Sequence, residues 1–163
     1  MSDRIKSFIK IIEDRTGSPT FCALPWIHLA TRPNGDARLC CVTNASGAHT
    51  GDHSVGLVKK ENGVPANFGV DTPLSAFNNQ YMRDVRLTML NGQIPASCTK
   101  CFEEEANGIM SKRQWETKVW QERLDLDSIV SQTADDGTLP VNIPYFDLLT
   151  AGFPCQPFSK GGK

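Results

Sequence analysis

The spacing of the cysteines constrains this chain more than any other feature of its sequence. Cys98 and Cys101 are separated by two residues, a spacing that lets two sulfur atoms reach one metal while backbone N–H groups turn toward them. A second pair, Cys22 and Cys40, stands on either side of a predicted hairpin. This arrangement predicts a fold in which a hairpin and the start of a helix meet at one four-cysteine site.

The predicted hairpin consists of strands at 26–30 and 37–42. The turn Pro33-Asn34-Gly35-Asp36 lies between them, and Asn-Gly is typical of hairpin turns because both residues tolerate positive φ. Side chains of successive strand residues face opposite ways, so only one of the neighbours Cys40 and Cys41 can easily join the site. The spacing from the turn glycine favours Cys40, and we expect Cys41 in the core.

The segment between Cys22 and the hairpin turn cannot be extended throughout. At about 3.3 Å per residue, a straight strand would carry Cys22 roughly 25 Å beyond the position opposite Cys40. We therefore expect the backbone to fold back near Leu24-Pro25, because proline favours a bend.

Helical periodicity occurs in three parts of the chain. Residues 3–14 carry apolar side chains at helical spacing. A second predicted helix begins near residue 75 and ends at Asn91-Gly92, and a third runs from about 102 to 124. The buried stripe of the second helix consists of Phe77, Tyr81, Val85 and Met89. The expected fold class is α+β, with a small β-hairpin and about three helices around the four-cysteine site, followed by a C-terminal linker and tail.

Length and composition limit the number of domains, the partners and the location that we expect for this protein. Its 163 residues fit one domain, and 17 basic against 18 acidic residues give no argument for nucleic acid from charge alone. The N-terminus lacks an uninterrupted apolar stretch, so we expect no signal peptide, no spanning helix and no membrane partner. The expected location is the cytoplasm, where thiols stay free or bind metal and a disulfide framework is disfavoured.

The order of cysteines and glycine resembles a known module. Cys22, Gly35 and Cys40, followed by Cys98-x-x-Cys101, are similar to the twitch domain of radical S-adenosylmethionine enzymes, the shorter relative of the SPASM domain. The resemblance covers residues 20–120. Flanking sequences that share it are Phe21-Cys22-Ala23-Leu24-Pro25-Trp26, Leu39-Cys40-Cys41, Met82-Arg83, Gly108 and Ser111-Lys112-Arg113.

This resemblance implies that Cys22, Cys40, Cys98 and Cys101 hold a [4Fe–4S] auxiliary cluster. Four thiolates also suit a single zinc ion, and four buried thiols can act simply as small apolar side chains. Radical enzymes of this kind need a further C-x-x-x-C-x-x-C motif, which this sequence does not contain. The resemblance therefore implies an auxiliary module whose radical S-adenosylmethionine half is missing or lies on a partner chain.

The C-terminus carries a second, shorter resemblance. Residues 147–163, which include Phe153-Pro154-Cys155-Gln156-Pro157, closely resemble the catalytic-cysteine loop of cytosine-5 DNA methyltransferases. The resemblance implies that the Cys155 thiolate attacks carbon 6 of a flipped-out cytosine, that S-adenosylmethionine supplies the methyl group, and that DNA is the partner. No F-x-G-x-G cofactor loop precedes this segment. A disordered, inert tail is the alternative.

These observations predict three parts of the chain. Residues 1–124 form a four-cysteine domain, residues 125–146 a polar linker that leads to a short strand near 145–149, and residues 147–163 a truncated methyltransferase-like segment. The first functional hypothesis is the auxiliary iron–sulfur module of a radical S-adenosylmethionine-type protein. The alternatives are a cytosine-5 DNA methyltransferase fragment acting through Cys155 and a structural zinc domain. Whether the chain is an enzyme by itself stays open.

Overall fold

The computed structural model describes residues 10, 13–14, 17–43, 54–123 and 125–140. Two short antiparallel strands and several helices confirm the predicted α+β class, although the described residues form more than three helices. The elements are α2 (Leu24–Ile27), β1 (Ala30–Thr31), β2 (Ala37–Arg38), α4 (Pro73–Phe77), α5 (Gln80–Leu90), the 3₁₀ helix η1 (Ala96–Cys98), α6 (Thr99–Ala106), α7 (Lys112–Gln121) and α8 (Leu126–Ser131).

The hairpin forms where the sequence predicts it but is much shorter. Ala30 pairs with Arg38 and Thr31 with Ala37, and Gly35 adopts a φ of 89° in the turn, a conformation that favours glycine. The expected strands at 26–30 and 37–42 are therefore wrong in extent, and Cys40 and Cys41 follow the end of β2. The segment 54–66 pairs with the other edge of β2.

The segment 54–66 contributes to the core. The N–H of Val58 donates to the carbonyl of Ala37, and the N–H of Ala37 donates to the carbonyl of Ala66. Val58 and Ala66 are almost completely buried. These hydrogen bonds satisfy backbone groups that would otherwise leave β2 with an open edge.

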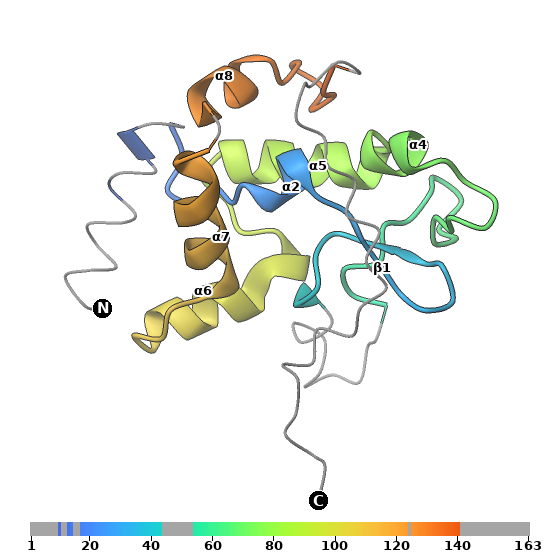
Figure 1. The fold of residues 1–163 in the computed structure, drawn as a ribbon, viewed down its shortest axis with the longest axis horizontal. Coiled ribbons are helices and arrows are strands. Elements are labelled where there is room, and N and C mark those ends of the chain that lie inside the picture. The colour runs from blue at the N-terminus through green and yellow to red at the C-terminus, as the bar shows by residue number, and fades with distance from the viewer. Residues whose placement is uncertain (1–9, 11–12, 15–16, 44–53, 124, 141–163) are drawn as a thin grey trace, which may run out of the picture.

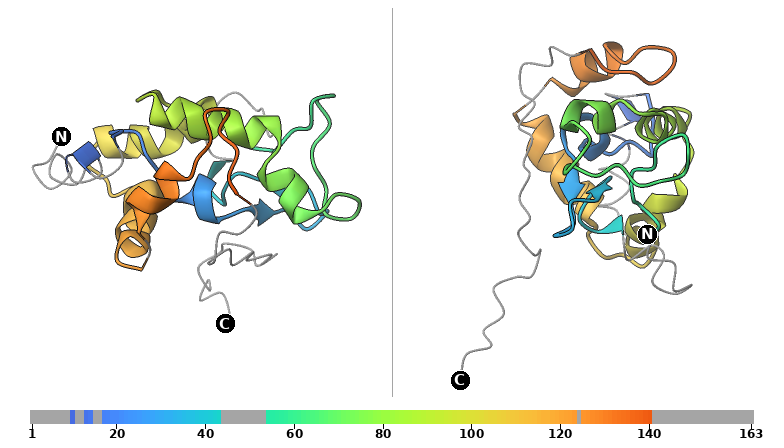
Figure 2. Two further views of the ribbon diagram at one scale, coloured as in Figure 1. Left: turned by 90° about the horizontal axis from the view of Figure 1, so that it is seen from above. Right: turned by 90° about the vertical axis from the view of Figure 1, so that its right-hand side faces the viewer.

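The centre of the core is the segment 18–27, which ends in the single-turn helix α2. Phe21 and Trp26 are fully buried, and their ring centroids are 4.8 Å apart. Helix α2 packs against α5 and α7, as Figures 1 and 2 show. Pro25 in its first turn bends the chain near the place expected from the position of Cys22.

Side chains from later elements hold this segment in place. The carbonyl of Met89 accepts hydrogen bonds from the hydroxyls of Ser18 and Thr20. Trp26 Nε1 donates to Thr133 Oγ1 at 2.8 Å. The N–H of Ala23 donates to Thr117 Oγ1 at 3.2 Å. Buried polar groups near the N-terminal end of the described chain are thus satisfied from α5, α7 and the segment after α8.

The predicted apolar stripe is confirmed, but the helix that carries it is interrupted. Phe77, Val85 and Met89 are buried and Tyr81 is half-buried. Helix α4 ends at Phe77, and the side chain of Asn79 caps α5 by accepting from the N–H of Met82. Asparagine is a strong N-cap, so it starts a new helix here.

The helix expected from 102 to 124 is likewise two helices. Helix α6 ends at Ala106, and Gly108 has a φ of 78°. Ser111 then caps α7 in a capping box with Gln114, a Ser-x-x-Gln pattern that marks a helix start in the sequence. The break lets the chain change direction between α6 and α7 (Figure 1).

The stretch expected as a polar linker after residue 125 contains a packed helix. Leu126 and Ile129 of α8 are buried in the core, as is Leu139. In the expected helix at 3–14, Lys10, Glu13 and Asp14 are helical, and the remaining residues lie outside the described part. The strand expected at 145–149 lies outside it as well. The division into domains stays a prediction.

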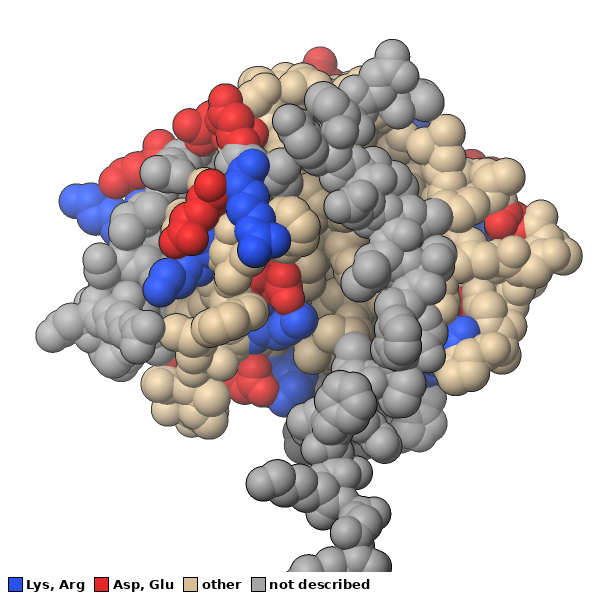
Figure 3. All heavy atoms as spheres, viewed as in Figure 1, with Lys and Arg blue, Asp and Glu red and all other residues tan. Residues whose placement is uncertain are grey.

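Charges of both signs occur on the face that α6, α7 and α8 contribute to. Figure 3 shows Lys and Arg side chains interleaved with Asp and Glu there. In the part of the chain that the structure describes, no helix has the length and apolar character needed to cross a membrane.

Candidate functional site

The four predicted cysteines come together around one cavity. Cys22, Cys40, Cys98 and Cys101 all line a small, partly open cavity of about 20 Å³, which has room for about one water molecule. The remaining lining residues are Leu24, Val42, Met89, Ser97, Lys100, Lys112 and Arg113. The cavity thus brings together cysteines from three separate parts of the sequence.

Each cysteine is positioned by the end of an element. Cys22 precedes α2, and Cys40 follows β2. Cys98 closes η1 and is the N-cap residue of α6, and Cys101 lies in the first turn of that helix. The positive end of the α6 dipole therefore faces the sulfurs, which favours negative charge on them.

A hydrogen-bonding partner lies beside each of the four sulfur atoms. The backbone N–H of Leu24 donates to Cys22, and the N–H of Val42 donates to Cys40. The N–H of Arg113 donates to Cys101. At Cys98 the partner is a side chain: Ser97 Oγ lies 4.0 Å from its sulfur, and either group can be the donor.

Burial is the main influence on the protonation of these thiols. Burial raises the pKa of Cys22, Cys40 and Cys98 far above the ordinary thiol range, and the neighbouring cysteines raise it further. The pKa of Cys101 is also raised, first by burial. The thiols are therefore neutral at pH 7 in the metal-free protein, and a bound cation would have to displace their protons.

A buried ion pair braces the cavity. The guanidinium of Arg113 pairs with the carboxylate of Glu105, and the two side chains are 2% and 5% exposed. Arg113 Nη1 also donates to the backbone carbonyls of Pro19 and Phe21, at 3.2 and 2.8 Å, and the hydroxyl of Ser111 donates to Glu105. This network connects α6 and α7 to the segment that presents Cys22.

The donor set suits zinc or an iron–sulfur cluster, but it is not assembled as a metal site. Within the described ranges, no group of three or more His, Cys, Asp or Glu side chains has the geometry to hold a metal ion. Four thiols are the right ligand type for either group. Their side chains would have to rearrange to bind one.

The other two cysteines differ from these four. Cys41 is half-buried and does not line the cavity. It is also not among the core residues, so its expected place in the core is not found. Cys155 lies outside the described residues. The sequence did not predict that Ser97 lines the cavity or that Glu105 pairs with Arg113. The one local signal for the ion pair was the capping box at Ser111, which indicates the start of the helix that carries Arg113.

Comparison with known proteins identifies one segment. A family model of C-5 cytosine-specific DNA methylases matches residues 107–163. The matched segment is about a third of the chain and includes α7, α8 and the sequence Phe153-Pro154-Cys155-Gln156. No curated protein and no solved structure matches the chain. None of these findings supports the resemblance of residues 20–120 to the twitch module.

Proposed function

We propose that residues 107–163 act as part of a cytosine-5 DNA methylase in which Cys155 is the nucleophile. The observation that carries this proposal is the match of the methylase family model, which extends to residue 163 and includes the cysteine loop. This function was the alternative hypothesis from the sequence, and the comparisons favour it over the radical S-adenosylmethionine hypothesis.

The chemistry assigned to Cys155 is a Michaelis-type addition to a flipped-out cytosine. The thiolate forms a bond to carbon 6, and the electron density placed on carbon 5 attacks the methyl group of S-adenosylmethionine, which leaves as S-adenosylhomocysteine. A base, such as water, then takes the proton from carbon 5, the sulfur–carbon bond breaks, and the Cys155 thiolate and the methylated base are released. DNA is therefore the proposed partner and S-adenosylmethionine the proposed methyl donor.

A trapping experiment tests this proposal directly. In DNA that contains 5-fluorocytosine, the fluorine at carbon 5 cannot leave as a proton, so the enzyme stays bound to the base. We expect a covalent adduct that forms with S-adenosylmethionine present and disappears in Cys155→Ser. Cys41→Ser is the matched control and should leave the adduct intact. No adduct from the unaltered chain with the methyl donor present would contradict the proposal.

A second candidate function rests on the cavity itself. We infer that Cys22, Cys40, Cys98 and Cys101 bind a [4Fe–4S] cluster, with zinc as the alternative. The four side chains line one cavity, and backbone N–H groups donate to three of the sulfurs; both observations support this inference. The finer hypothesis, an auxiliary cluster of a radical S-adenosylmethionine-type protein with its other half on a partner chain, depends on the sequence resemblance alone.

Metal analysis after anaerobic purification tests the second function. A cluster gives a brown protein with roughly four irons and four sulfides per chain. The metal should be lost in Cys98→Ala and kept in Cys41→Ala, which removes a cysteine that does not line the cavity. One zinc per chain would establish the structural alternative. A protein that binds neither metal after reconstitution would exclude this function.

A further inference from the structure

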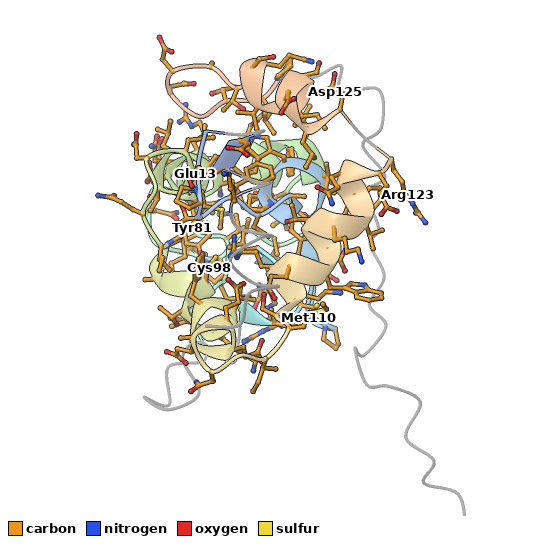
Figure 4. The ribbon with its side chains drawn as sticks, turned by 90° about the vertical axis from the view of Figure 1, so that its left-hand side faces the viewer. Glu13, Tyr81, Cys98, Met110, Arg123 and Asp125 are labelled. Carbon is orange, nitrogen blue, oxygen red and sulfur yellow. The ribbon has the colours of Figure 1, made fainter. Side chains whose placement is uncertain are left out.

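Three large apolar side chains lie exposed at the turn from α6 to α7 and on α7 itself. Ile109 is 58% exposed, Met110 42% and Trp115 56%. These three residues are called here the α7 patch. Figure 4 shows Met110 at the start of α7 and Arg123 beyond its end. Large apolar side chains that gather on a surface mark sites of contact with other molecules.

Trp115 stands on the face of α7 that points away from the core. Gln114 and Thr117 are buried on the other face. Trp115, Lys118 and Glu122 are exposed, and side chains three and four residues apart are neighbours on the surface of a helix. The packing of α7 against the rest of the chain therefore does not account for a tryptophan at position 115.

The backbone that carries the patch is held in place by contacts within the chain. The N–H of Ile109 donates to the carbonyl of Glu104 at 2.9 Å, and Gly108 turns the chain with a φ of 78°. Ser111 then fixes the start of α7 through its capping box. A surface that is already ordered loses less conformational entropy when it binds a partner.

The charges beside the patch have both signs. Lys112 pairs with Glu116 within α7, whereas Lys118 and Glu122 form no ion pair with any residue that the structure describes. A polyanion such as DNA would meet two glutamates here, and their carboxylates would repel its phosphates. A partner that carries the same mixture of charges fits better, and a second copy of this chain carries that mixture.

Two-fold symmetry allows the charges of two copies to complement each other. In a two-fold dimer, a contact from one residue to another is always made a second time in the opposite direction. When two α7 helices pack antiparallel, Lys118 of one copy approaches Glu122 of the other, and the same pair forms again. Parallel helices would instead bring identical charges together.

We propose that the α7 patch is a homodimer interface in which two α7 helices pack antiparallel around Trp115. Tryptophan and methionine are enriched at the centres of protein interfaces, and truncation of a central tryptophan is among the changes that cost most binding energy. Lys118 and Glu122 form the polar rim and set the direction of the helices. This inference does not depend on either function proposed above.

Sedimentation velocity at a series of protein concentrations tests this inference, because a dimer gains population as the concentration rises. The unaltered chain should change from monomer to dimer across the series. Trp115→Ala should raise the dissociation constant roughly tenfold or more, with an unchanged circular dichroism spectrum. Val70→Ala is the matched control, because it shortens an apolar side chain that is 84% exposed in the loop before α4. It should leave the dissociation constant unchanged.

A charge exchange tests the antiparallel direction. Lys118→Glu and Glu122→Lys should each weaken the dimer several-fold, because each change brings like charges together across the interface. Both changes in one chain should restore the dissociation constant, since every pair then re-forms with its signs exchanged. A double variant that stays as weak as the single variants would show that the two residues do not face each other.

Two results would overturn the interface itself. One is a chain that sediments as a monomer at every concentration, and the other is a dimer that Trp115→Ala leaves intact. Binding of duplex DNA is measured on the same samples by fluorescence anisotropy. A monomer that binds DNA and loses this binding in Trp115→Ala would assign the α7 patch to DNA instead of a second copy.

Discussion

The buried pair of Glu105 and Arg113 allows a quantitative test of how the cysteine cavity is held together. Arg113→Met keeps much of the aliphatic length of the side chain and removes its charge. The variant leaves a carboxylate that is 5% exposed without its cation, and the carbonyls of Pro19 and Phe21 lose a donor. Removing one partner of such a pair costs about 3–5 kcal/mol, against a total stability of about 5–15 kcal/mol for a domain.

Urea unfolding measures this cost, provided that the slope of the transition is unchanged. Glu105→Gln combined with Arg113→Met should lose less stability than the two single changes together, because no uncompensated carboxylate remains. Lys112→Met is the matched control on the same helix. Lys112 pairs with Glu116 and is 35% exposed, so its loss should change stability by no more than about 0.5 kcal/mol. A cost below about 1 kcal/mol for Arg113→Met would refute the reasoning.

Two further predictions concern backbone fit and pH. Gly137→Ala should lower the melting temperature more than Gly63→Ala. A Cβ at Gly137 would stand 2.6 Å from the carbonyl oxygen of Arg83, whereas a Cβ at Gly63 would meet nothing within 4 Å. Both glycines have positive φ, and placing alanine in that conformation costs about 1–2 kcal/mol at either position. Equal losses would show that the close approach is unimportant. Burial lowers the pKa of His28, so below pH 6.5 the unfolded chain binds a proton that the folded chain resists, and stability should fall as the pH falls. His28→Gln should flatten this dependence in urea unfolding between pH 5 and 7, and an identical slope in both proteins would contradict the assignment.

Local patterns in the sequence predicted the features whose causes are local. Gly35 in the hairpin turn and the apolar stripe of α4 and α5 follow from residues within a few positions of each other. Helix α2 could not be predicted in this way. Leu24-Pro25-Trp26-Ile27 has the apolar and aromatic composition of a strand, and its helical turn is stabilised by packing against α5 and α7, which lie more than fifty residues away.

The candidate site likewise combines features with local causes and features that depend on contacts between distant residues. The spacing of the cysteines led to the prediction of a metal site at Cys22, Cys40, Cys98 and Cys101, which line one cavity, and the metal site itself stays a prediction. The residues that brace them could not be found, because Arg113 reaches the carbonyl of Pro19 across 94 positions of sequence. Only the folded backbone brings these groups together.

The central segment 18–27 has a consequence for the order in which this protein folds. Trp26 finds its hydrogen-bond partner Thr133 only 107 residues later. At the usual rate of synthesis of 5–20 residues per second, a ribosome needs roughly 5–20 s to make that stretch. Until α5 and α7 are made, the apolar side chains of Phe21 and Trp26 lack the helices against which α2 packs, which makes the nascent chain a target for chaperones and for aggregation. The segment 18–27 is therefore synthesised early but reaches its final packing late. Cys22 lacks its neighbours Cys98 and Cys101 until those residues have been synthesised.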